Sequence, residues 1–199
     1  LRRRYGGGAR TVIGMVSRLH RGKVHADLLA AFAKIPAGPN DIRLWLVGDG
    51  PERGRLGAQV RNLGLEDRVV FAGDRNDARD WTAAMDIFVH PTNAEGLPNA
   101  VLEAMAAGKP VISSRIDGLK ELITPGIDGW LVEPGDTAAL ADAIQYVLDH
   151  PDEAAEVARA GAERVRTHFS LARQIGAYDE LFRSLVAERA APVSASDPR

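Results

Sequence analysis

Two glutamates seven residues apart flank the start of a predicted helix. Glu95 lies in a loop, and Glu103 lies on the helix that Pro98 begins, one turn beyond Asn99. The free backbone N–H groups at such a helix N-terminus favour an anion such as phosphate. A carboxylate among apolar helical neighbours needs hydrogen-bond donors, and a sugar diol could supply them. We therefore predict a site that combines phosphate with hydroxyl groups. The alternative is that Glu103 is solvated or paired with a nearby basic side chain.

Two basic side chains follow the first predicted strand. Residues 11–16 form this apolar strand, and Arg18 and Lys23 stand in the loop behind it. The Arg18 guanidinium can donate two parallel hydrogen bonds to phosphate oxygens, and Lys23 offers a compact charge, a combination that suits a diphosphate. His20 and His25 are five residues apart and no carboxylate or cysteine accompanies them, so we predict no metal site.

Alternating apolar strands and helices must position these residues. The further strands are predicted at 42–47, 69–72, 86–90, 110–114 and 128–132. The alternation predicts an α/β fold, a three-layer Rossmann-like domain with a mainly parallel sheet, whose ligands bind at the carboxyl ends of the strands. Arg18, Gly48, Gly73 and Glu95 all follow strand ends, so one crevice could collect them.

Composition narrows the class of protein. The chain has 199 residues, 45% hydrophobic and 26% charged, enough for one domain with a full core. A net charge of -2 argues against nucleic acid as the main partner. The absence of cysteine excludes disulfides and thiol catalysis. No apolar run approaches the ~18 residues of a membrane span and no secretory signal is visible, so we expect a cytoplasmic protein.

The residues from Glu95 to Glu103, continued by residues 104–110, closely resemble the two-glutamate motif of the retaining nucleotide-sugar glycosyltransferases of family 4, also called group 1. The resemblance extends from about Leu1 to Ala187. It implies the GT-B arrangement, in which two Rossmann-like domains face each other across a cleft, and this chain is similar to the C-terminal one. The implied donor is a UDP or GDP sugar, used in polysaccharide biosynthesis. The implied partner is a further N-terminal domain that binds the acceptor and could contact a membrane surface.

The resemblance also implies roles for individual residues. Glu95 would hold the transferred sugar, while Arg18 and Lys23 stabilise the leaving diphosphate, and these three are the catalytic candidates. Glu103 would hold the ribose hydroxyls. The donor-binding candidates are Glu103, Gly96, Leu97, Pro98, Asn99, Gly48, Gly73 and Arg75. Because cations and a helix N-terminus supply positive charge, we expect neither a metal nor a cofactor.

Two positions differ from the family pattern. Val24 stands where glycine or aspartate more often follows the lysine, which affects the shape of the loop. Asp117 replaces one glycine of the family's glycine pair within residues 116–121.

The two ends of the chain suggest how it is joined to the rest of a larger architecture. Residues 1–9 are predicted to be a linker with a solvated basic start, and residues 10–169 the nucleotide-sugar-binding domain. Residues 170–189 form a helix that, by the resemblance, crosses toward the partner domain. We expect its apolar stripe to promote self-association when uncovered. Residues 190–199 are predicted to be a disordered tail.

Three other functions fit parts of the pattern. Gly48, Gly50 and Gly54 follow a strand and form a loose dinucleotide fingerprint, so an NAD(P)-binding domain is an alternative. A glycosidase would use Glu95 and Glu103 as its pair of carboxylates. A non-catalytic nucleotide-binding module would keep the same residues without turnover.

Overall fold

Six strands form a parallel sheet at the centre of the fold, which the computed structural model describes for residues 1–36 and 42–190. The strands are β1 (Thr11–Val16), β2 (Ile42–Val47), β3 (Val69–Gly73), β4 (Ile87–His90), β5 (Val111–Ser114) and β6 (Trp130–Val132). They lie in the order β3-β2-β1-β4-β5-β6, and every pairing between them is parallel. This is the doubly wound order of Rossmann-like domains, which confirms the predicted fold class.

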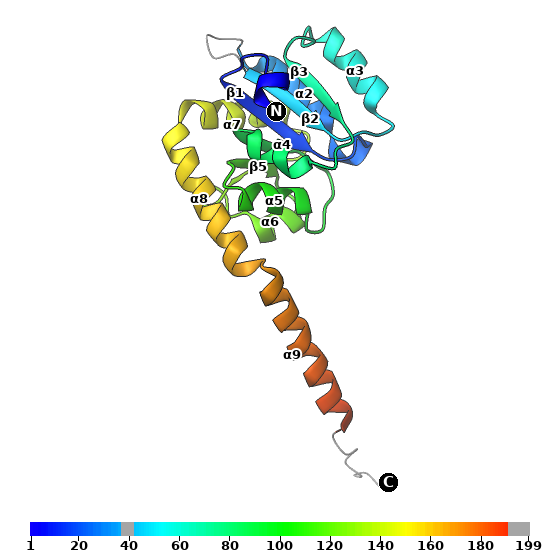
Figure 1. The fold of residues 1–199 in the computed structure, drawn as a ribbon, viewed down its shortest axis with the longest axis vertical. Helices are drawn as coiled ribbons and strands as arrows, with labels where there is room; N and C mark the ends of the chain where they lie inside the picture. Colours follow the sequence, from blue (N-terminus) through cyan, green and yellow to red (C-terminus); the bar gives the residue numbers. More distant parts are fainter. Residues whose placement is uncertain (37–41, 191–199) are drawn as a thin grey trace.

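Helices cover both faces of this sheet (Figure 1). They are α1 (Arg2–Tyr5), α2 (His25–Lys34), α3 (Arg53–Asn62), α4 (Ala78–Ala84), α5 (Asn99–Ala106), α6 (Asp117–Leu122), α7 (Thr137–Asp149), α8 (Pro151–His168) and α9 (Leu171–Ala190), with the 3₁₀ turn η1 (Arg21–Lys23). Helices α2, α3 and α7 pack on one face, and α4, α5 and α6 on the other. The turn η1 and the helices α1 and α6 were not predicted.

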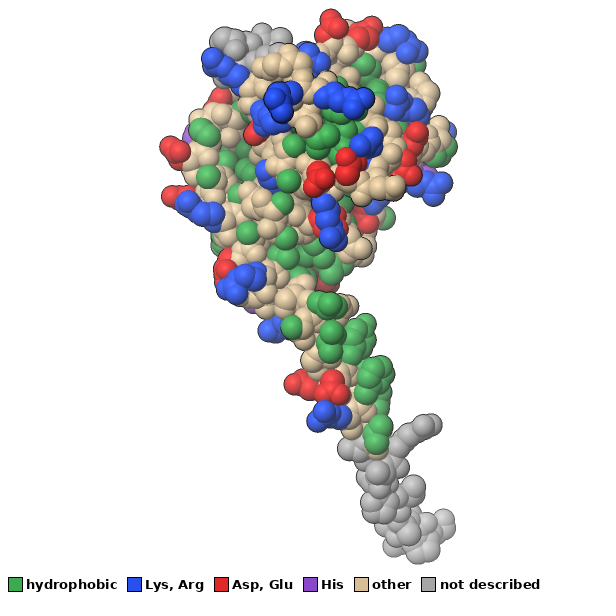
Figure 2. Space-filling model, in the orientation of Figure 1, with side chains coloured by type: hydrophobic (Ala, Val, Ile, Leu, Met, Phe, Trp, Pro, Cys, Tyr) green, Lys and Arg blue, Asp and Glu red, His purple; other side chains and the backbone are tan. Residues whose placement is uncertain are grey.

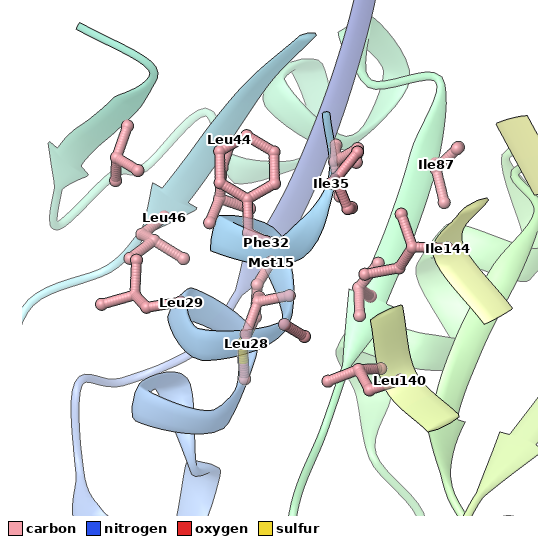
Figure 3. Close-up of a cluster of buried hydrophobic side chains, with 14 of the residues drawn as sticks. Met15, Leu28, Leu29, Phe32, Ile35, Leu44, Leu46, Ile87, Leu140 and Ile144 are labelled. Atoms are coloured by element: carbon pink, nitrogen blue, oxygen red, sulfur yellow. The ribbon is translucent and has the colours of Figure 1, made fainter. Parts of the chain in front are cut away.

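The larger core lies between the sheet and helices α2 and α7 (Figure 3). Leu28, Leu29 and Phe32 of α2 are fully buried with Leu44 and Leu46 of β2. Burial of each such side chain stabilises the fold by roughly 1.5–3 kcal/mol. The strand ends and the loops that follow them are therefore attached to a rigid base.

The first residues lie against the domain, so the prediction of a solvated basic start was wrong for Arg2. Its guanidinium donates hydrogen bonds of 2.8 and 2.7 Å to the Asp86 carboxylate, just before β4. The Tyr5 ring packs on buried Trp81 with centroids 4.8 Å apart. A nearby carboxylate and an aromatic surface outweigh the tendency of this segment to stay in solvent. Its role as an interdomain linker stays a prediction.

Helix α9 leaves the domain and extends away from it (Figure 1). Its apolar stripe is exposed along the helix, as Figure 2 shows, and consists of Leu171, Ile175, Tyr178, Leu181, Phe182 and Leu185. Crossing toward a partner domain and self-association through this stripe stay predictions. The predicted disordered tail, from residue 191 onward, lies outside the described residues. Among the described helices, none is both long and apolar enough to cross a membrane.

Candidate functional site

The carboxyl ends of β1 and β4 meet at the centre of the sheet, where the strand order reverses direction. These strands are neighbours although β2 and β3 lie between them in the chain. Open α/β sheets bind their ligands in the crevice that forms at such a switch point. The loop after β1 and the loop after β4 therefore define the candidate site.

A lysine and a glutamate from these two loops form an ion pair. The Lys23 ammonium contacts Glu95 Oε1, and His90 Nε2 lies 3.3 Å from the same oxygen. The side chains of Lys23 and Glu95 are 26% and 15% exposed, so water screens the pair only in part. Burial also lowers the pKa of Lys23. The structure thus brings together two of the three predicted catalytic residues.

His90 is the last residue of β4, and its side chain forms a hydrogen bond with the Glu95 carboxylate. It is buried, and burial together with the charges of Lys23 and His25 lowers its pKa to about 3, so the ring is neutral at physiological pH. Its Nδ1 has no hydrogen-bond partner among the described residues. The Nε2–H therefore donates to Glu95, and His90 fixes the carboxylate without adding charge.

Hydrogen bonds between the two loops maintain this arrangement. The Thr92 N–H donates to Ser114 Oγ at 2.9 Å, which ties the loop after β4 to β5. The Thr92 hydroxyl and the Asn93 N–H both donate to the Gly22 carbonyl, at 3.2 and 3.1 Å. The positions of Lys23 and Glu95 are therefore coupled through the backbone.

Helix α6 touches the other side of the Glu95 loop. At Gly118 a Cβ atom would overlap the carbonyl oxygens of Glu95 and Gly96, so the contact requires a glycine. Asp117, which replaces the first glycine of the family's pair, points into solvent and pairs with Lys120 at 3.2 Å. The substitution therefore leaves the contact at Gly118 intact.

The N-terminus of α5 follows Glu95 directly. Pro98 is the N-cap residue, with extended ψ of 113°, so the predicted helix start at Pro98 was one residue too early. No side chain caps this terminus. Gly96, Leu97 and Asn99 are exposed beside it. An anion would meet free backbone N–H groups here, as predicted for the phosphate.

Val24 adopts a strained backbone conformation directly after Lys23. Its φ of 35° makes it the one described non-glycine residue with positive φ. A β-branched side chain is unfavourable there. We expect Val24→Gly to raise the free energy of unfolding by about 1 kcal/mol, because the strain removed exceeds the entropy that glycine adds. Urea denaturation measures this, and a loss of stability would show that the Val24 side chain contributes more by packing than it costs by strain.

A hollow of about 350 Å³ lies at the ends of β1, β2 and β3, and its lining residues include Arg18, Gly48 and Arg75. Arg18 is exposed and makes no ion pair with a described residue, so its guanidinium is available for a ligand. Gly48 has φ of 133° and packs against the Ser17 carbonyl, and its N–H donates to the Gly73 carbonyl at 2.8 Å. Gly48 thus lines the hollow and Gly73 holds it by this hydrogen bond. The contact of either glycine with a donor stays a prediction.

Arg75 is already engaged within the chain. Its guanidinium donates two hydrogen bonds to the Asp77 carboxylate, at 2.7 and 2.8 Å. The hydrogen bond from Arg75 also lowers the pKa of Asp77. A direct bond from this side chain to a donor would have to displace Asp77, whereas the backbone of the same loop remains at the hollow.

Glu103 is half-exposed, so the prediction of a buried carboxylate was wrong, and it is paired with a basic side chain, as the alternative interpretation expected. The helix does bury Val101, Ala104 and Met105, but Glu103 faces outward. Arg79 donates two hydrogen bonds, of 3.1 and 3.0 Å, to Oε1 alone. Glu103 Oε2 has no hydrogen-bond partner among the described residues, and Glu103 lines a hollow of about 740 Å³ together with Arg79. One oxygen thus remains for a ligand.

Comparison with known proteins identifies the family. The family model "Glycosyl transferases group 1" matches residues 10–150. The chain belongs to this family. This group 1 chain is 38% identical over 178 residues to the lipopolysaccharide core biosynthesis glycosyltransferase LpsD of Rhizobium meliloti, and the match covers 89% of the chain and 50% of that relative. The chain thus spans about half the length of the curated relatives it matches.

Two solved structures resemble this group 1 chain. The crystal structure of HepE from Anabaena in complex with UDP and glucose has a TM-score of 0.86 and 31% identity, covering 92% of this chain and 51% of that one. The C-terminal domain of a group 1 family protein, LpcC from Francisella tularensis, has a TM-score of 0.75 and 25% identity, covering 82% of this chain and 88% of that one.

The glycines that suggested a dinucleotide site have a packing role in this group 1 chain. They follow β2, whereas the loop after β1, which faces the switch point, carries no glycine fingerprint. A Cβ at Gly50 would overlap the Leu19 carbonyl, just as Gly48 meets Ser17. Close contact between two loops therefore explains Gly48 and Gly50, whereas a Cβ at Gly54, on α3, would meet no atom within 4 Å. In the described part of the chain, no cluster of three or more His, Asp or Glu side chains could hold a metal ion.

Four residues of the site were not predicted: His90, Arg79, Ser17 and His25. Ser17 Oγ lies 2.9 Å from His25 Nε2 at the edge of the Arg18 hollow. The signal for His90 was its place at the end of a strand directly before the Glu95 loop. Arg79 is 24 residues from Glu103 in the chain, and no local pattern connects the two.

Proposed function

We propose that this chain is the C-terminal, donor-binding half of a retaining glycosyltransferase with the GT-B arrangement. Together with an N-terminal acceptor-binding domain, it would transfer a sugar from a nucleoside diphosphate to an acceptor. The observation that carries this proposal is the Lys23–Glu95 pair at the switch point, beside the uncapped N-terminus of α5. This arrangement offers positive charge to phosphate and a carboxylate to sugar hydroxyls within one crevice.

The comparisons support the proposal from two sides. HepE is named in complex with UDP and glucose, which supports a UDP sugar as the donor. The LpcC structure is named as a C-terminal domain, and this chain covers 88% of it, which supports the same placement here. The retaining outcome rests on the resemblance of residues 95–103 to the family motif.

The site residues divide the chemistry between them. Arg18, Lys23 and the α5 N-terminus would bind the diphosphate and stabilise the charge that it gains on leaving. When the diphosphate binds, it would draw the Lys23 ammonium away from Glu95. The Glu95 carboxylate would keep its hydrogen bond from His90 and could then accept hydrogen bonds from the sugar. The donor phosphate itself would then accept the proton of the attacking hydroxyl in a front-side reaction.

The first test is direct binding of UDP, GDP and ADP to this chain by calorimetry, with NADH as the competing class. We expect a nucleoside diphosphate to bind without an added divalent ion. Arg18→Ala should raise its Kd about 10- to 100-fold, the range for a lost hydrogen bond to a charged group. The control is Arg61→Ala, an exposed arginine on α3 outside the candidate site. Unchanged affinity in Arg18→Ala, or binding only with a divalent ion, would contradict the phosphate assignment.

A second test concerns the ribose. Because Glu103 Oε2 is the free oxygen beside Arg79, we expect it to accept hydrogen bonds from the ribose hydroxyls. Glu103→Gln should raise the Kd for UDP about tenfold and the Kd for 2′-deoxy-UDP much less. Glu66→Gln, an exposed glutamate next to β3, is the matched control. An equal loss for both nucleotides would refute the ribose role.

A further inference from the structure

A serine and a buried histidine form a hydrogen-bonded pair beside Arg18. Ser17 Oγ lies 2.9 Å from His25 Nε2. His25 is 2% exposed on α2, while Ser17 is half-buried and lines the hollow of about 350 Å³ together with Arg18. No function described above uses this pair.

The direction of the hydrogen bond follows from the other ring nitrogen. His25 Nδ1 has no partner among the described residues. A buried N–H group without an acceptor is rare, whereas an unpaired lone pair costs less. Burial and the charge of Lys23 keep the ring neutral, with a pKa of about 4. The single proton therefore lies on Nε2, and His25 donates to Ser17 Oγ.

This direction leaves the hydroxyl proton of Ser17 unused. His25 Nε2 is the one recorded side-chain partner of Ser17 Oγ among the described residues. The Ser17 O–H must find another acceptor, and the adjacent open space is the hollow that Arg18 lines. Two acidic residues also line the hollow: Asp74 in the loop after β3, and Asp49 in the loop after β2, whose Oδ1 accepts the Gly50 N–H at 2.7 Å. Because Arg18 supplies the positive charge and Ser17 the unused hydroxyl proton, the anionic part of a ligand is favoured beside these two residues.

We propose that Ser17 donates a hydrogen bond to a phosphate oxygen of the nucleoside diphosphate, and that His25 is the positioning residue that turns the Ser17 hydroxyl toward it. This inference rests on the proposed function, because it names a further contact of the same ligand. The neutral ring of His25 acts as a fixed donor behind Ser17. Arg18 attracts the negative charge of the ligand, and the Ser17 O–H requires an acceptor oxygen beside it, so the pair selects for phosphate oxygens.

The experiment measures Kd for UDP and for uridine with Ser17→Ala, His25→Leu, His25→Gln and the double variant Ser17→Ala/His25→Leu. We expect Ser17→Ala and His25→Leu each to raise the Kd for UDP about tenfold and to leave that for uridine nearly unchanged. His25→Gln, whose amide can donate in place of Nε2–H, should restore most of the affinity. In the double variant the loss should equal that of Ser17→Ala alone, because His25 acts through Ser17.

The outcomes separate this inference from the proposed function. If the unchanged chain binds no nucleoside diphosphate, the proposed function itself fails. If it binds UDP but Ser17→Ala binds equally well, or if losses are equal for UDP and uridine, the phosphate contact is refuted. If the losses of Ser17→Ala and His25→Leu add in the double variant, His25 does not act through Ser17. Urea denaturation of each variant checks that it is folded at the temperature of the titration.

Discussion

Replacing Gly118 by alanine is expected to weaken UDP binding at least about 100-fold, although Gly118 carries no side chain that could touch a ligand. A Cβ at this position would overlap the Gly96 carbonyl oxygen and lie 2.5 Å from the Glu95 carbonyl oxygen. Helix α6 cannot retreat, because Leu119 and Leu122 are fully buried beneath it. The Glu95 loop must move instead, and a displacement of about 1 Å in a site can cost about 100-fold.

Urea denaturation and UDP titration of the Gly118→Ala variant test this expectation. The free energy of unfolding should fall by roughly 1–3 kcal/mol, the usual cost of an overpacked contact. Gly54→Ala on α3 is the matched control, because a Cβ there meets no atom within 4 Å and alanine favours a helix. A Gly118→Ala variant that binds UDP like the unchanged chain would show that the Glu95 loop accommodates the methyl group without cost to the site.

The sequence predicted the strands well because each is a short apolar run, and four of the six, β1, β2, β4 and β5, are largely buried. Residues 11–16 and 42–47 match the observed strands to the residue. Their apolar composition is a property of the run itself, so it can be read without knowing which helices cover the strand. The boundary at Pro98 was less certain, because the fixed φ of proline suits both the N-cap and the first helical position.

The site was predictable in its positions and less so in its contacts. Lys23 and Glu95 were both identified from residue type, but their direct pairing depends on the crossover that makes β1 and β4 neighbours. Arg79, an exposed residue of α4, pairs with Glu103 of α5 and occupies one of its two carboxylate oxygens. Which charges pair is decided by tertiary proximity, and a single sequence does not encode it locally.

The acid sensitivity of this fold is expected to come from its two buried histidines. Burial and the Lys23 charge lower the pKa of His25 from 6.5 to about 4, although the Glu52 charge acts in the opposite direction. Burial, Lys23 and His25 lower the pKa of His90 from 6.5 to about 3. Glu95 does not retain a proton on His90, because its charge is shared with the Lys23 ammonium. Both rings stay neutral while the fold is intact.

The sign of the effect follows from proton uptake. Below pH 6.5 the unfolded chain protonates both histidines, whereas the folded chain does so only near pH 4 and pH 3. The unfolded state therefore binds more protons in this window, and the free energy of unfolding must fall as the pH drops from 6.5 toward 4. At 1.36 kcal/mol per pKa unit, these differences correspond to about 3 kcal/mol for His25 and about 5 kcal/mol for His90. About 3 kcal/mol of each contribution is lost between pH 6.5 and pH 4.

Urea denaturation between pH 7 and pH 4 measures this loss, and His25→Leu should remove roughly half of it because leucine takes up no proton. The same variant should be at least as stable as the unchanged chain at pH 4, where a buried charge no longer has to be avoided. NMR titration of the two imidazoles in the folded chain provides an independent check. Protonation of either ring near pH 6.5 would mean that water or a counter-charge reaches it. His90, which donates to Glu95, and His25, which donates to Ser17, would then be cations in weak acid rather than neutral donors.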